Sequence, residues 1–149
     1  MPDLTSFRRL LHSNPELSGE EKETQKRIIS FLNEYGIDNG KEVGKYGLIY
    51  PFHFGEGPHL LIRVDIDALP IQEINSFEHK SLIEGVSHKC GHDGHTAIGI
   101  GLALKFKQNP LNAGKVTILF QPAEEIGEGA QGILGDPKFN CKDYDYAVA

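Results

Sequence analysis

The 149-residue sequence has no tryptophan, only two cysteines and no apolar run long enough to cross a bilayer. Two cysteines, Cys90 and Cys141, cannot build the disulfide framework of a small secreted domain. A single bridge between them is the less favoured alternative to two free thiols. The N-terminus also lacks a secretory signal. We therefore expect a cytoplasmic protein that does not enter a membrane.

Basic residues are also fewer than acidic ones. The sequence has 15 lysines and arginines and 21 acidic residues, which gives a formal net charge of −6. Nucleic acids and anionic membranes both bind basic surfaces, so neither is an expected partner. A chain of this length can bury a real core, and this one contains no repeats, low-complexity tracts or linkers. We expect residues 1–149 to belong to one domain.

Hydrophobic periodicity predicts helices and strands that alternate along the chain. The first half opens with a helix over 4–11, and a second helix starts at Ser18, where Glu21 completes a capping box. The later predicted elements are strands at 47–54, 59–64, 116–120 and 144–149 and helices at 98–106 and 127–134. This alternation is typical of an α/β sandwich around a largely parallel sheet.

The densest group of metal-binding residue types is the segment 88–95, His-Lys-Cys-Gly-His-Asp-Gly-His. Imidazole and thiolate bind zinc and its neighbours, and carboxylates also bind manganese. Taken alone, Cys90 and His92 would more often be a buried thiol beside a structural histidine. The acids described next favour the alternative, in which both residues bind a metal in an open site rather than in a closed structural zinc site.

Carboxylates follow two of the predicted buried strands. Asp65 and Asp67 come at the end of one strand, and Glu124 and Glu125 come just after another. The carboxyl ends of parallel strands converge on one crevice, so we expect these acids near Cys90. Adjacent glutamates usually mark a solvated helix face. Here one carboxylate can bind metal while its neighbour accepts a proton from water, as metal-assisted hydrolysis requires.

Other polar residues near these motifs have weaker assignments. His95 is a further ligand, a hydrogen-bond partner or a first-turn helix residue, and the last two are favoured. We interpret His88 as support for the ligands rather than as a ligand, and Asp93 as a cap of the following helix. His12 and Glu16 are assigned to a solvated surface rather than to a site.

Four blocks of the sequence occur in a characteristic order at 8–18, 63–73, 87–97 and 120–125. They resemble the M20 metallopeptidase family, specifically the amidohydrolase branch with N-acyl-amino-acid amidohydrolases, hippurate hydrolases and plant auxin-conjugate hydrolases. The resemblance implies a three-layer α/β/α sandwich around a largely parallel mixed sheet, as in zinc exopeptidases. It also implies that residues 1–149 are the N-terminal part of the catalytic domain, without the dimerisation domain and the C-terminal part.

The resemblance further implies the roles of the site residues. Cys90, His92 and Glu125 would be ligands in a site for two divalent ions, with zinc, manganese, cobalt and nickel as candidates. Glu124 would be the general base that activates water, and Asp67 would orient a metal-binding histidine. Asp65 stands where the wider family has a histidine ligand and is not assigned as a ligand.

The implied reaction is hydrolysis of an N-acyl amino acid with an acetyl or aromatic acyl group. The complete protein would act on this small molecule as a homodimer or a higher oligomer. The sequence ends at Ala149, before the segments that supply two further histidine ligands in the family, so this chain alone is expected to be inactive. The alternative hypotheses are a noncatalytic binding module with a relic metal site and a structural zinc domain.

Overall fold

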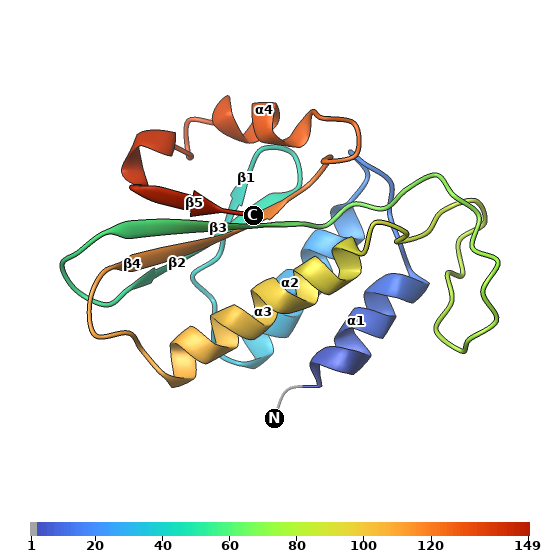
Figure 1. The fold of residues 1–149 in the computed structure, drawn as a ribbon, viewed down its shortest axis with the longest axis horizontal. Coiled ribbons are helices and arrows are strands. Elements are labelled where there is room, and N and C mark those ends of the chain that lie inside the picture. The colour runs from blue at the N-terminus through green and yellow to red at the C-terminus, as the bar shows by residue number, and fades with distance from the viewer. Residues whose placement is uncertain (1–2) are drawn as a thin grey trace.

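A computed structural model describes residues 3–149 as one five-stranded sheet with helices on both faces (Figure 1). The strands are β1 (Lys41–Val43), β2 (Gly47–His53), β3 (His59–Asp65), β4 (Lys115–Gln121) and β5 (Tyr146–Val148). The helices are α1 (Leu4–Ser13), α2 (Lys22–Glu34), α3 (His92–Gln108) and α4 (Gly129–Leu134), with a 3-10 helix at Cys141–Asp143. Within this described part of the chain, no helix has the length and apolar character to cross a membrane.

The sheet is mixed, with the strand order β1-β2-β4-β3-β5. β3 runs parallel to β4 and β5, whereas β1 and β2 form a hairpin that pairs antiparallel to β4. The layered α/β fold expected from the sequence is confirmed, and parallel pairing is confined to β3, β4 and β5. The register sets Asp65, the last residue of β3, opposite Gln121, the last residue of β4. The segments after both strands therefore start from the same edge of the sheet.

Helices α1, α2 and α3 cover one face of the sheet, and α4 lies on the other (Figure 1). The three-helix layer buries the larger core, which includes Phe7, Leu11, Ile28, Leu32, Ile100, Ile118 and Phe120. Gly99 lets α3 approach the sheet closely, because a Cβ atom there would lie 2.9 Å from side-chain atoms of both Phe120 and Val64. This close packing holds α3 against β3 and β4.

Helix α3 begins at His92 rather than at Ile98, where the apolar pattern starts. The polar residues of the first turn hide the helical period from a sequence analysis. Gly91 precedes the helix with a φ of 85°, a left-handed conformation that glycine adopts without strain. As a result, His92 and His95 lie on the same helix face, one turn apart.

The capping box expected at Ser18 and Glu21 is wrong. Helix α2 begins only after Glu21, and Glu16 caps it instead, because its carboxylate accepts hydrogen bonds from the backbone N–H groups of Glu23 (3.1 Å) and Thr24 (2.6 Å). Glu16 therefore has a structural role rather than a solvated one. The side chains of Ser18 and Glu21 are directed elsewhere, as described below.

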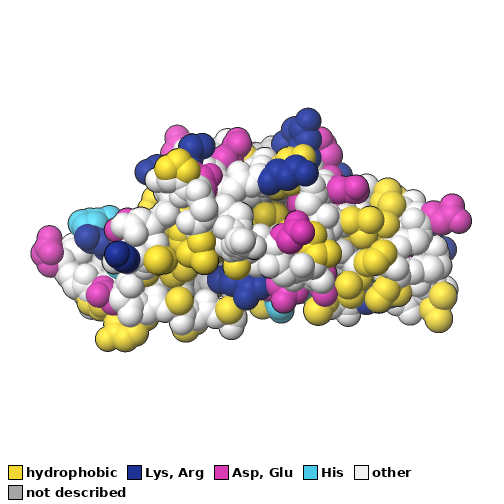
Figure 2. All heavy atoms as spheres, turned by 90° about the horizontal axis from the view of Figure 1, so that it is seen from above, with side chains coloured by type: hydrophobic (Ala, Val, Ile, Leu, Met, Phe, Trp, Pro, Cys, Tyr) yellow, Lys and Arg dark blue, Asp and Glu magenta, His cyan; other side chains and the backbone are white. Residues whose placement is uncertain are grey.

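The segment 71–89 contains no helix or extended strand. It exposes large apolar side chains, including Ile74, which is 92% exposed, and Leu82, which is 70% exposed. Figure 2 shows hydrophobic atoms gathered at the end of the molecule where Figure 1 draws this segment. The apolar surface at this end is therefore uncovered in the isolated chain.

Candidate metal centre

The segments that follow β3 and β4 meet the N-terminus of α3 at one edge of the sheet. Asp67 lies just past β3, and Glu125 lies just past β4. The backbone N–H of Glu125 donates to the Asp67 carboxylate at 3.0 Å, which ties the two segments together. The Thr96 hydroxyl contacts the backbone oxygen of Asp65 at 3.2 Å and so ties α3 to the end of β3.

Asp67 is the centre of the hydrogen-bond network at this edge, and its side chain is fully buried. One carboxylate oxygen lies 3.1 Å from Nδ1 of His92, and the other accepts from the Ser18 hydroxyl at 2.7 Å and from the Glu125 N–H. Burial alone would raise the pKa of Asp67, but these hydrogen bonds outweigh it and lower the pKa. Because an ionised carboxylate only accepts, we assign the ring proton of His92 to Nδ1, which leaves a lone pair on Nε2.

The structure brings Cys90, His92 and Glu125 together, as the sequence analysis predicted. Their metal-binding atoms all lie within 4.8 Å of one another. His92 Nε2 and Glu125 Oε1 are 3.8 Å apart, which is too long for a hydrogen bond. Two ligands held at about 2.1 Å by one tetrahedral ion lie about 3.4 Å apart, so a small closure would allow one ion to bind both atoms. The role of the three residues as ligands stays a prediction.

The electrostatics of this cluster favour a cation. Glu125 Oε1 is buried and has no hydrogen-bond partner within residues 3–149. A hydrogen bond to Glu125 and the neighbouring carboxylates raise the pKa of the Cys90 thiol. Burial by itself lowers the pKa of His92, but the Asp67 hydrogen bond and the surrounding acids outweigh it and raise that pKa. These features reflect excess negative charge, so the donor set fits a divalent transition metal.

Glu124 lies beside the cluster, with Oε2 3.9 Å from Nε2 of His92. Its side chain is 38% exposed, whereas that of Glu125 is 17% exposed. The two adjacent glutamates therefore differ as the hypothesis of one ligand and one base requires. Glu125 points into the cluster, and Glu124 keeps access to water. The role of Glu124 as a base stays a prediction.

The turn that carries both glutamates has an unusual backbone conformation. Ala123 has a φ of 51°, which costs a residue other than glycine about 1 kcal/mol or more. The fully buried Glu21 holds this turn, since its carboxylate accepts from the N–H groups of Ala123 (2.7 Å) and Gly19 (2.9 Å). Burial raises the pKa of Glu21. The sequence analysis missed this role because Glu21 and Ala123 are 102 positions apart.

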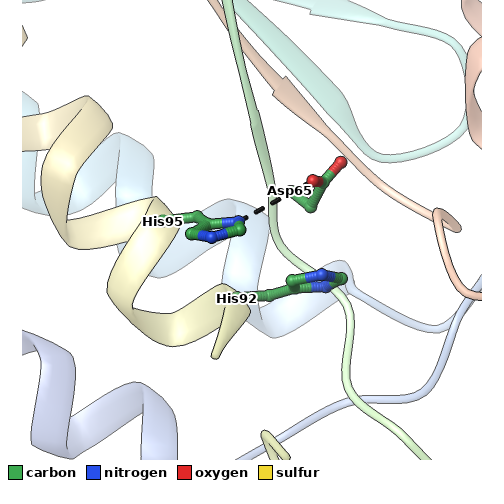
Figure 3. Close-up of side chains that lie close together, drawn as sticks. All are labelled: Asp65, His92 and His95. Carbon is green, nitrogen blue, oxygen red and sulfur yellow. Dashed lines mark ion pairs between the residues drawn. The ribbon is translucent and has the colours of Figure 1, made fainter. Parts of the chain in front are cut away.

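A second group of potential metal ligands, Asp65, His92 and His95, adjoins the first (Figure 3). The donor atoms of Asp65, His92 and His95 also lie within 4.8 Å of one another. One Asp65 oxygen lies 3.8 Å from Nδ1 of His95, and the other oxygen pairs with the Arg63 guanidinium. His95 lies in the first turn of α3, which is one of the two positions favoured from the sequence.

The assignment of His12 to a solvated surface is wrong, because its ring is buried between two carboxylates. Nδ1 lies 3.0 Å from Asp93, and Nε2 lies 3.3 Å from Glu73. Asp93 does not cap α3 as expected, because its carboxylate faces this ring and accepts from Arg8 at 3.0 Å. Burial opposes ionisation of Glu73, but the Lys89 ammonium and other hydrogen bonds lower its pKa to about 2. These contacts, called here the His12 network, tie α1 to Asp93 in α3 and, through Glu73, to Lys89.

His88, interpreted from the sequence as support for the ligands, is buried beside the His12 network. Its ring centroid lies 6.4 Å from that of His12. Neither ring nitrogen of His88 has a hydrogen-bond partner within the described part of the chain. Burial lowers the pKa of His88 to about 4. His88 therefore donates no hydrogen bond to a predicted ligand among the described residues, and its role as support for the ligands stays a prediction.

Residues 61–149 match the model of peptidase family M20/M25/M40, and the chain belongs to this family. The resemblance to the M20 family that the four sequence blocks indicated is therefore confirmed.

The relatives of the chain include two hydrolases of amino-acid derivatives. It is 44% identical over 133 residues to the IAA-amino acid hydrolase ILR1-like 5 of Arabidopsis thaliana. This match covers 88% of this chain and 30% of that protein. It is 44% identical over 142 residues to the N-acetyl-L-cysteine deacetylase of Bacillus subtilis. This match covers 94% of this chain and 34% of that protein. The chain thus spans about a third of the length of these curated relatives.

A solved structure with the same fold comes from Bacillus subtilis and is described as a dinuclear metal binding peptidase from the M20 family. It matches this chain with a TM-score of 0.82 and 45% sequence identity. The match covers 88% of this chain and 38% of that one.

Proposed function

We propose that this chain is the N-terminal part of the catalytic domain of a metal-dependent amidohydrolase that cleaves N-acyl amino acids. The observation that carries the proposal is the convergence of Cys90, His92 and Glu125 donor atoms within 4.8 Å, beside the half-exposed Glu124. The substrate class is supported by the names of the two relatives, which both refer to hydrolysis or deacetylation of amino-acid derivatives.

In this proposal, Cys90 binds the metal as a thiolate, His92 through Nε2 and Glu125 through its buried oxygen. When bound, a divalent ion polarises the acyl oxygen and lowers the pKa of water toward about 7. The description of the similar Bacillus subtilis structure as dinuclear supports two ions in the complete protein. Thiolate and imidazole ligands favour zinc, cobalt or nickel, and the carboxylates also suit manganese.

Glu124 is proposed as the general base. It accepts a proton from the attacking water while the water oxygen bonds to the acyl carbon. It then returns a proton to the amide nitrogen as the carbon–nitrogen bond breaks, and a carboxylic acid and an amino acid are released. Asp67 acts as a positioning residue, because its hydrogen bond to Nδ1 keeps Nε2 of His92 unprotonated and directed into the cluster.

We further propose that the 149-residue chain alone is inactive or nearly so, and that the complete protein is a homodimer or a higher oligomer. The support for inactivity is that the chain spans only about a third of the length of its curated relatives, and the oligomer is what the resemblance to the M20 family implies. Cys90, His92 and Glu125 are three protein ligands, which is too few to hold two ions.

Zinc binding by equilibrium dialysis and elemental analysis tests this proposal. We expect the chain to retain zinc, and Cys90→Ser or Glu125→Gln to weaken binding by about tenfold or more. His53→Gln is the control, because His53 is exposed and pairs with Lys115 at the far end of β4 from the site. Absence of zinc binding would favour a noncatalytic module. Unfolding by a chelator would favour a structural zinc domain.

A further inference from the structure

His92 belongs to two groups of potential ligands, and only one of them, with Cys90 and Glu125, enters the proposed hydrolase site. The other consists of Asp65, His92 and His95 (Figure 3). We propose that Asp65, His92 and His95 form a second binding position for a divalent cation, which competes with the first for His92. This inference goes beyond the proposed function, although it shares one ligand with it.

Regular secondary structure delivers all three side chains of the second position. His92 and His95 are three residues apart in α3, so both project from one helix face, and their ring centroids lie 5.3 Å apart. Asp65 is the last residue of β3, which packs against α3. Ligands on a helix and a strand are held more firmly than ligands on loops. The three donor atoms of the second position thus already lie within 4.8 Å of one another in the chain.

The gap between Asp65 and His95 suits a bound ion better than a direct contact. Asp65 Oδ2 and His95 Nδ1 are 3.8 Å apart, which exceeds hydrogen-bond length. Two ligands of one tetrahedral ion lie about 3.4 Å apart at metal–ligand distances of about 2.1 Å. The His95 side chain is 49% exposed and can make the small movement needed. Solvent can also deliver an ion to this side of the pair.

Arg63 is the charged group that opposes a cation here. Its guanidinium contacts the other oxygen of Asp65 and holds that carboxylate in place. This contact leaves Oδ2 as the free ligand atom, while the positive charge of Arg63 repels an incoming ion. We therefore expect the second position to bind more weakly than the first.

A single chain can fill only one of the two positions with His92 as a ligand. Nδ1 of His92 contacts Asp67, so only the lone pair on Nε2 is free, and one lone pair binds one ion. The positions also differ in chemistry. The first offers a thiolate, whereas the second offers two imidazoles and a carboxylate, a donor set known from catalytic zinc sites. Softer metals should prefer the first position, and Mn²⁺ should bind the second comparatively better.

Binding of Mn²⁺ and Co²⁺ to the 149-residue chain tests the proposal. The double variant Cys90→Ser/Glu125→Gln keeps every ligand of the second position and loses two of the first. We expect it to bind one Mn²⁺, followed by the loss of the free-ion electron paramagnetic resonance signal. We also expect its Co²⁺ spectrum to lack the thiolate charge-transfer band of the unmodified chain. Adding His95→Gln should weaken Mn²⁺ binding by about tenfold or more.

Two controls make the outcome decisive. Adding His53→Gln to the double variant should leave Mn²⁺ binding unchanged, and circular dichroism establishes that each variant is folded. A folded double variant that binds no Mn²⁺ overturns the second position, as does equal binding with and without His95→Gln. Failure of the unmodified chain to give the thiolate band, with Mn²⁺ binding intact, would instead contradict the proposed hydrolase site. The two failures are therefore distinguishable.

Discussion

The side chain of Asp67 contacts three segments that are distant in sequence: Ser18 before α2, His92 in α3 and Glu125 after β4. Asp67→Asn keeps the shape of the side chain but replaces one acceptor oxygen with a donor. We expect zinc affinity to fall by about 10- to 100-fold, because a neighbour that orients a ligand typically contributes this much. Isothermal titration with zinc measures the change. An unchanged affinity would contradict the positioning role of Asp67.

The His12 network makes a prediction about stability. His12→Leu leaves the buried carboxylates of Asp93 and Glu73 without the ring that lies between them. Loss of one partner from a buried charged contact is strongly destabilising, and we expect a cost of roughly 3 kcal/mol. Urea unfolding measures it, with His53→Leu as an exposed control expected within about 0.5 kcal/mol of the parent chain. A similar cost in both variants would mean that the network contributes little.

The lowered pKa of the buried His88 predicts that the stability of the chain depends on pH. Its pKa is about 4 in the folded chain, because burial disfavours the charged ring, against about 6.5 when unfolded. The unfolded state therefore binds the proton more strongly, and stability falls as the pH drops from about 6.5 to 4, by roughly 3 kcal/mol.

Replacement of this ring isolates its effect. His88→Leu should flatten the decline between pH 6.5 and 4 in urea unfolding measured across that range. The acids Asp67 and Asp93 have lowered pKa values, so their stabilisation is lost only at lower pH, as their folded forms become protonated. A decline that persists unchanged in His88→Leu would assign it to another group.

At the scale of elements, α4 packs on the turn that carries Glu124 and Glu125. A Cβ atom at Gly129 would lie 1.7 Å from the backbone oxygen of Pro122, so Gly129→Ala must move the helix or the turn. We expect a destabilisation of about 3 kcal/mol, at the upper end of the cost of overpacking, together with weaker zinc binding. Thermal unfolding and zinc titration measure the two effects.

The same helix supplies a matched control. A Cβ atom at Gly132 would meet nothing within 4 Å, so Gly132→Ala should stabilise α4 by up to about 1 kcal/mol. If both substitutions have the same effect, the close approach at Gly129 does not hold the turn.

At the scale of the whole molecule, the chain leaves apolar surface uncovered beside β5, the exposed edge strand. A cavity of about 470 Å³ lies there, lined by side chains that include Leu61, Ile133, Phe139 and Tyr144. Its lining contains none of the three predicted ligands, so this cavity and the candidate metal centre are different places. An unpaired strand edge next to such a hollow favours association with further polypeptide.

Activity is the prediction that belongs to this scale. We expect the 149-residue chain to release no amino acid from N-acetyl-amino acids at a measurable rate. The complete protein encoded by the native reading frame should hydrolyse them. In that protein, Glu124→Gln should lower kcat by about 10²- to 10⁴-fold and leave the metal content unchanged, because only the base is lost. A ninhydrin assay with parallel metal analysis measures both. Substantial activity of the short chain would contradict the need for later segments.

Local patterns predicted the layered α/β fold and favoured metal binding by Cys90 and His92, whereas the assignment of Glu125 as a ligand and Glu124 as the base came from the resemblance to the M20 family. Cys90 and His92 are close in sequence, and the acids follow two strongly apolar strands, so strand-end geometry alone predicted that they converge. Boundaries were harder to predict where polar residues begin a helix, as at His92. Glu21 was misassigned because a carboxylate that bonds a backbone N–H 102 positions away leaves no local signal.

The amino-acid sequence by itself determined which residue types reach the ends of β3 and β4, because apolar runs and the chemistry of the segment 88–95 are local properties. Only the tertiary structure decided what those residues contact. It buried His12 between two carboxylates and set His92 between two groups of ligands. The physical reason is that each of these contacts joins segments whose meeting depends on the packing of helices against the sheet, and no short stretch of sequence carries that information.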